Sequence, residues 1–204
     1  GELGNAEKAA LEDRIAARGR GVRPSRVDLD SDGLADLFVD YAKGVDMSVD
    51  RVASMEDVPD RVADYLAREN LPANLRLAPD PSLDGIPWEK RPTLTITRGK
   101  TDGSDEVALT GVFAGVAETG TLIMRSGPEH PTTLNFLPDS HLVVIRKSQI
   151  VGSYEDVWDK IRDGEMPRTV NFITGPSRTG DIEQTIFMGA HGPRRMHIVL
   201  VEDE

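Results

Sequence analysis

The sequence of 204 residues contains no cysteine. Disulfide bonds, thiolate catalysis and cysteine-ligated iron–sulfur clusters are therefore excluded for this chain. Long apolar runs are missing as well, because none approaches the roughly 18 residues that a membrane span requires. We therefore expect no membrane span and take a cytoplasmic setting as the default.

Positive charge is scarce, since 24 Lys and Arg residues stand against 35 Asp and Glu residues and give a net charge of −11. Such a surface repels a phosphate backbone, which argues against nucleic-acid binding. The four histidines do not show metal-ligand spacing such as His-Glu-x-x-His, so no metal site is predicted. No glycine-rich dinucleotide or phosphate-loop motif occurs either, and we predict no cofactor in this chain.

Helical periodicity alternates along the chain with short apolar runs that are typical of strands. Helices are predicted over residues 5–18 and 31–43, then around Val58–Leu66 and Val157–Ile161, the last two after capping-box spacings at Ser54 and Ser153. A short helix capped by Thr110 is expected to reach Val116. Strands are predicted near residues 45–49, 75–77, 94–96, 122–124, 141–145, 170–173 and 198–201. This alternation favours a three-layer α/β fold with a largely parallel sheet.

Two regions are predicted from the distribution of charge. Residues 1–27 combine the first helix with a basic arm that holds Arg18, Arg20, Arg23 and Arg26 among glycines and a proline. The arm is either a solvated linker or a clamp on a partner or an anionic ligand. Residues 28–204 are predicted to form a single α/β domain.

The stretch from Thr174 to Glu183 is the candidate anion site. A predicted strand (residues 170–173) runs into a Gly-Pro turn, and a short helix is expected after it. Helix-start N–H groups together with Ser177, Arg178 and Thr179 suit a carboxylate or phosphate. Arg178 could instead pair with Asp181 or Glu183, which are themselves candidates for ligand contacts or helix caps.

Two further residues are candidates for chemistry. Glu118 stands at the start of a turn before an apolar strand, where a carboxylate can act as base or nucleophile. The alternative is that Glu118 accepts backbone N–H groups and fixes the turn. His191 lies among glycines, which let the backbone approach a ligand closely, although a structural hydrogen bond explains it equally well.

Four sequence blocks carry a resemblance to a known family. They are Ala117-Glu118-Thr119-Gly120-Thr121, Leu137-Pro138-Asp139-Ser140-His141, Gly175-Pro176-Ser177-Arg178-Thr179-Gly180-Asp181-Ile182-Glu183 and Gly189-Ala190-His191-Gly192-Pro193. In this order the blocks resemble the LUD-domain family, with one departure at Gly180, where the family commonly has Ala. The resemblance covers about residues 105–201 and implies a fold like that of the NagB/RpiA/CoA-transferase group.

The resemblance also implies a function. It points to an accessory, non-redox subunit of a system that oxidises L-lactate to pyruvate, with iron–sulfur clusters on two partner proteins. A small anionic ligand would bind in a cleft between the Glu118 turn and the Arg178 loop. Two alternatives stay open: a stand-alone enzyme of the CoA-transferase or sugar-phosphate-isomerase type that uses Glu118, and a ligand-sensing regulatory module.

Overall fold

The computed structural model describes residues 4–17, 19–179 and 187–202. The helices are α1 (Asn5–Ala17), α2 (Ser31–Gly44), α3 (Val58–Arg68), α4 (Thr133–Phe136) and α5 (Tyr154–Arg162). The strands up to the middle of the chain are β1 (Ser48–Val52), β2 (Asn74–Leu77), β3 (Thr95–Arg98), β4 (Val107–Thr110), β5 (Ala114–Val116) and β6 (Thr121–Arg125). They are followed by β7 (Ser140–Arg146), β8 (Ile150–Val151), β9 (Val170–Ile173), β10 (Arg178–Thr179), β11 (Phe187–Met188) and β12 (Arg195–Val201).

A six-stranded sheet in the order β1-β12-β7-β4-β2-β3 forms the centre of the molecule. All of its strand pairs are parallel. Its central strands are buried on both faces, which explains their continuous apolar sequences. Leu142 and Val144 of β7 face the cluster that contains α3, whereas Val143 and Ile145 face the cluster that contains α2. The predicted three-layer α/β fold with a largely parallel sheet is confirmed.

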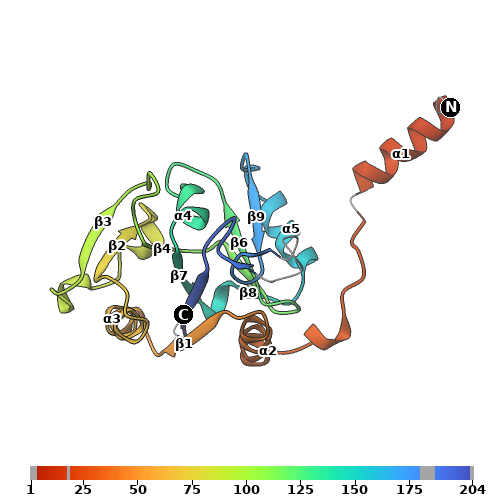
Figure 1. The fold of residues 1–204 in the computed structure, drawn as a ribbon. Helices are drawn as coiled ribbons and strands as arrows, with labels where there is room; N and C mark the ends of the chain where they lie inside the picture. Colours follow the sequence, from red (N-terminus) through yellow and green to blue (C-terminus); the bar gives the residue numbers. More distant parts are fainter. Residues whose placement is uncertain (1–3, 18, 180–186, 203–204) are drawn as a thin grey trace.

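A second sheet, in the order β8-β5-β6-β9, was not predicted. Strand β6 runs antiparallel to both β5 and β9, so the strands predicted at residues 122–124 and 170–173 belong to this second sheet. One face of this sheet packs with α2 through Leu122 and Met124. The other face packs with α5 through Val157 and Ile161. Figure 1 shows β6, β9 and α5 together on one side of the parallel sheet.

The helix predicted from Thr110 to Val116 is also wrong. Residues 107–110 and 114–116 are the strands β4 and β5, which include the β-branched residues Val107, Thr110 and Val116. The Thr110 hydroxyl does not cap a helix but lies 2.8 Å from Nε2 of buried His141. The capping boxes at Ser54 and Ser153 are both present.

The N-terminal helix α1 extends away from the rest of the molecule on an extended arm (Figure 1) and buries none of its described side chains. The arm itself is held by ion pairs with the start of α5. Arg20 lies 2.7 Å from Asp156 and 3.1 Å from Asp159, and Arg23 lies 3.6 Å from Asp156. The basic arm therefore clamps an acidic helix end of its own chain. In the described part of the chain, no helix is both long and apolar enough to cross a membrane.

Candidate functional site

The topology of the parallel sheet predicts where a ligand can bind. From β2 the chain continues outward to β3, whereas from β4 it proceeds in the opposite direction through β7 to β12. In open α/β sheets, ligands bind beyond the carboxyl ends of the strands at such a reversal of order. A cavity of about 220 Å³ lies at this position, lined by residues that directly follow β2 and β4.

Asp80, which follows β2, is the buried acid of this pocket, with 4% of its surface exposed. Its Oδ1 accepts the Ser82 N–H at 2.9 Å. Burial alone would raise the pKa of Asp80, but hydrogen bonds from His130 and Ser82 together hold that pKa below its ordinary value. Glycine is required at position 111, because a Cβ there would collide with the Asp80 carboxylate. The backbone after β4 therefore closes tightly over an ionised acid.

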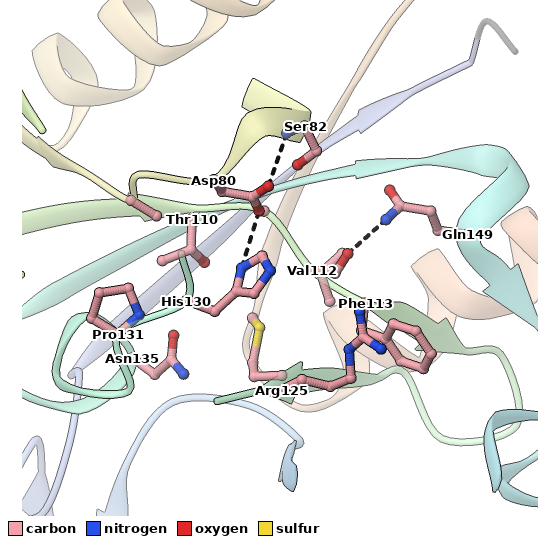
Figure 2. A pocket seen from close by; sticks show the side chains of 13 residues that line it. Asp80, Ser82, Thr110, Val112, Phe113, Arg125, His130, Pro131, Asn135 and Gln149 are labelled. Atoms are coloured by element: carbon pink, nitrogen blue, oxygen red, sulfur yellow. Dashed lines mark hydrogen bonds and ion pairs between the residues drawn. The ribbon is translucent and has the colours of Figure 1, made fainter. Parts of the chain in front are cut away.

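His130 is paired with Asp80 across the pocket, with 3.4 Å between Nδ1 and Oδ2. The histidine sits on a tight turn in which Gly127 and His130 exchange backbone hydrogen bonds of 3.3 and 3.1 Å. Among the described residues, its other ring nitrogen, Nε2, has no hydrogen-bond partner. Figure 2 shows the His130 ring in the middle of the lining, below Asp80. Asp80 thus orients an imidazole whose second nitrogen is available to a ligand.

Arg125, at the end of β6, supplies positive charge to the pocket. Its guanidinium carbon lies 3.9 Å from the centre of the Phe113 ring. Within the described ranges, Arg125 forms no ion pair with an acidic side chain. Stacking on an aromatic ring leaves the planar fork of the guanidinium free to bind a carboxylate.

Two amides complete the lining, and they differ in their partners. Gln149 donates from Nε2 to the Val112 carbonyl oxygen at 2.6 Å and is fixed in place. Asn135 is 6% exposed, and its side chain has no hydrogen-bond partner in the part of the chain that the structure describes. The same part of the chain contains no group of three or more His, Cys, Asp or Glu residues arranged to hold a metal ion.

The sequence did not identify this pocket. Asp80 lies in a proline-rich connection and His130 in a long loop, so neither belongs to a recognisable motif. The available signal was positional and incomplete: Asp80 comes shortly after the strand predicted at residues 75–77, whereas Gly111 fell in the helix predicted from Thr110 to Val116. Pairing these positions required the strand order, which periodicity does not supply.

Glu118, the predicted catalytic residue, lies outside the pocket. It is buried, with 8% of its surface exposed, and its Oε1 accepts the Tyr154 N–H at the start of α5 at 3.0 Å. Its Oε2 lies 3.8 Å from Arg26 of the arm. This is the structural alternative that the sequence left open, in which the carboxylate fixes a turn.

The Glu118 turn and the 175–179 loop do lie at neighbouring strand ends, because β6 and β9 are paired. The Thr121 and Thr174 hydroxyl oxygens are 2.7 Å apart, and the Tyr154 hydroxyl lies 2.8 Å from Thr119 Oγ1. Gly120 has a positive φ of 65° and packs against the backbone of α2, where a side chain would collide. These turns therefore meet around the end of α2.

Arg178 does not point into the pocket at Asp80. Its guanidinium pairs with Asp46, just after α2, and its side chain is 41% exposed. The helix expected after Gly175 does not begin there, because Arg178 and Thr179 form β10, which pairs with β11. Between Gly175 and Thr179 the structure therefore provides no helix-start N–H groups. Asp181 and Glu183 lie outside the described residues.

Ser177 and His191 belong to the same corner of the molecule. Ser177 Oγ accepts the His191 backbone N–H at 3.2 Å, and the Ser177 N–H donates to the Pro193 carbonyl oxygen at 2.8 Å. The His191 residue is exposed and lies outside the Asp80 pocket. The structure thus brings most of the predicted site residues together at the opposite edge of the parallel sheet, where β7 and β12 begin.

The fold defines a doubly wound α/β protein with a cavity at the reversal of its strand order. The chain belongs to the LUD-domain family, whose model matches residues 35–201. A crystal structure of a DUF162 family protein from Deinococcus radiodurans has a similar fold, with a TM-score of 0.64 and 24% identity, and the match covers 85% of this chain and 99% of that one.

Similar sequences come from several bacteria. An uncharacterized protein of Neisseria meningitidis is 36% identical over 98 residues, which are 47% of this chain and 42% of that protein. Lactate utilization protein C of Anoxybacillus flavithermus is 35% identical over 88 residues (43% of this chain, 40% of that protein). The same protein of a Geobacillus strain is 37% identical over 93 residues (43% and 39%). The chain thus matches about two fifths of the length of these relatives.

Proposed function

We propose that this chain is a non-redox accessory subunit of a lactate-utilisation system and that it binds a small organic acid in the Asp80–His130 pocket. The LUD-domain family and the relatives named lactate utilization protein C support the pathway. The lack of cysteine supports a division of labour in which cytoplasmic partner proteins carry the iron–sulfur clusters.

We infer the class of ligand from the arrangement of charge in the pocket. An ionised, buried acid pairs with His130, while Arg125 has no acidic partner among the described residues. A 2-hydroxy acid matches this pattern, because its carboxylate suits the guanidinium fork and its hydroxyl suits the Asp80–His130 pair. The cavity of about 220 Å³ is smaller than the roughly 300–1,000 Å³ of sites for drug-sized ligands, so its size suits a small acid.

Calorimetric titration of the purified chain with L-lactate and pyruvate tests the ligand. We expect Arg125→Lys to weaken binding by at least about tenfold, because an ammonium group cannot reproduce the planar fork. Arg178→Lys is the matched control, since Arg178 lies on another part of the molecule. If Arg178→Lys abolishes binding while Arg125→Lys does not, the acid binds at the corner predicted from the sequence and the pocket assignment fails.

The partner proposal has a separate test. A tagged copy of the chain, expressed together with the cluster-bearing proteins of the same system, should retain them in a brown complex with measurable iron. If acid binds but neither iron nor those partners are retained, the accessory role is wrong and the ligand-sensing module becomes the better description.

The Asp80–His130 pair favours a second candidate, an acid–base enzyme of the isomerase type. A histidine oriented by a carboxylate is a common source of general-base catalysis. In this version the base is His130 and not Glu118, which caps α5. Net conversion of a small hydroxy or oxo acid to an isomer by the isolated chain, beyond binding or hydrogen exchange, would favour this candidate over the accessory role.

A further inference from the structure

We propose that His130 is a general base and that the pocket removes a proton from the carbon beside the carbonyl group of a small 2-oxo acid. The inference rests on the proposed function, because it requires a small acid in this pocket. It adds a reaction that the chain can perform alone, without partner or cofactor.

The first support is the orientation of the imidazole. Asp80 Oδ2 faces His130 Nδ1 at 3.4 Å, and Asp80 is itself fixed by the Ser82 N–H. A carboxylate at Nδ1 stabilises the tautomer that carries its proton there, so that Nε2 keeps its lone pair and acts as the base. The same carboxylate stabilises the imidazolium that forms when Nε2 accepts a proton.

The second support is that His130 has no nucleophile among the described residues to deprotonate, so the proton it takes comes from a bound molecule or from water. In catalytic triads the base activates a serine or cysteine, but no hydroxyl of the described residues is hydrogen-bonded to His130. The Thr110 hydroxyl in the same lining is held by His141 at 2.8 Å. Cysteine is absent from the chain. A base without a protein nucleophile acts directly on a bound molecule or on water.

The third support lies in the donors around the histidine. Asn135, 6% exposed, brings an unpartnered amide to the cavity, and Arg125 brings a guanidinium without an acidic partner in the described ranges. In Figure 2, Asn135 lies to one side of the His130 ring and Arg125 lies with Phe113 to the other. One donor can hold the carboxylate while the other stabilises negative charge that develops on the carbonyl oxygen.

The step balances without an oxidant. The C–H bond beside the carbonyl breaks, its proton moves to His130 Nε2, and its electron pair forms a carbon–carbon double bond. The electron pair of the carbonyl π bond moves to oxygen, which gives an enolate next to the donors. When the step reverses, the carbon takes back a proton that His130 has exchanged with solvent. A 2-oxo acid is also the product of oxidising a 2-hydroxy acid, so this activity would follow that oxidation.

The test is hydrogen exchange of the pyruvate methyl group in D₂O, followed by proton NMR with the purified full chain. We expect the chain to accelerate exchange and His130→Gln to slow it by roughly 10²–10⁴-fold, the usual contribution of a general base. His191→Gln is the matched control, since that histidine is exposed and outside the pocket. Acceleration that persists in His130→Gln, or pyruvate that binds without any accelerated exchange, would overturn the inference.

Two measurements distinguish loss of the general base from misfolding and from failure of the proposed function. Calorimetry on His130→Gln should still detect pyruvate, because Arg125 remains; if the wild-type chain binds no acid, the proposed function fails as well. Asp80→Asn tests the positioning role of the carboxylate. We expect this variant to lower kcat for exchange while KM for pyruvate stays nearly unchanged, because the amide no longer orients the imidazole whereas Arg125 still binds the carboxylate. An unchanged kcat would contradict the Asp80–His130 pair as the catalytic unit.

Discussion

His141 and His197 lie one register position apart on the neighbouring strands β7 and β12, and neither side chain reaches solvent. Burial lowers the pKa of His141 to about 4. Burial also lowers the pKa of His197 to about 4, although Asp50 at 3.6 Å opposes this effect. Each histidine is therefore neutral in the folded protein throughout the pH range in which an unfolded histidine takes up a proton.

This difference predicts a loss of stability in mild acid. The pKa of each histidine in the folded protein lies below the unfolded value of 6.5. The contribution of the neutral histidine to folding stability is therefore complete above pH 6.5 and declines as the pH falls toward 4. Each histidine contributes a slope of up to about 1.4 kcal/mol per pH unit. Denaturant unfolding at pH 7, 6 and 5 should show this decline. His141→Gln should reduce the slope, whereas His191→Gln should not, and a flat profile would contradict the assignment.

At the scale of single residues, the sequence singled out residue types but did not show where the side chains lie. Glu118, Ser177 and Arg178 were singled out for their residue types. In the structure, Glu118 binds the start of α5, Ser177 is hydrogen-bonded within a turn, and Arg178 forms an ion pair with Asp46. Asp80 and His130 had no motif around them. Their pairing across 50 residues depends on the strand order, which local sequence patterns do not encode.

At the scale of elements, α5 shows why Glu118 is buried next to a turn. The capping box of Ser153 and Asp156 leaves the N–H of Tyr154, the first helical residue, to the Glu118 carboxylate. Arg20 and Arg23 of the arm bind the same helix start through Asp156. The carboxylates and the helix dipole stabilise each other, and the arginines balance the acidic charge.

Substitution of Glu118 distinguishes this cap from a catalytic role. Glu118→Ala leaves the part-buried Tyr154 N–H without its partner and should lower the free energy of unfolding by about 1 kcal/mol or more. Glu118→Gln keeps a carbonyl acceptor and should cost less than about 1 kcal/mol. Thermal and denaturant unfolding provide the measurement. Loss of acid binding or exchange in a fully stable Glu118→Gln protein would instead assign Glu118 to the site.

Helices and strands were predicted correctly where local sequence rules determine them. The prediction failed where pairing with distant strands determines the structure. Capping boxes and helical spacing placed α2, α3 and α5, and short apolar stretches placed β2 and β7. The short segments around Thr110 and Leu122 carry β-favouring residues, but the direction of their partners is set by packing against α2 and α5. Periodicity therefore located β6 without showing that it runs antiparallel in a second sheet.

At the scale of the whole molecule, the N-terminal region joins the α/β part through a few contacts. Helix α1 buries no described side chain, whereas Val27, at the end of the arm, is fully buried and lies against Gly152. Arg23 donates to the Val27 carbonyl oxygen at 3.0 Å and also reaches Asp156. From these contacts we expect the α/β domain to extend to about Arg23, about five residues before the start at residue 28 predicted from the sequence.

Two truncated chains test this boundary. A chain that begins at Arg23 should unfold at nearly the same temperature as the full chain, because the residues removed contribute only exposed ion pairs, worth about 0–1 kcal/mol each. A chain that begins at Asp28 also loses Val27, whose burial contributes about 1.5–3 kcal/mol, and should unfold several degrees earlier. Differential scanning calorimetry compares the two. Equal midpoints would restore the boundary at residue 27, and an early transition in the longer chain would show that α1 stabilises the domain.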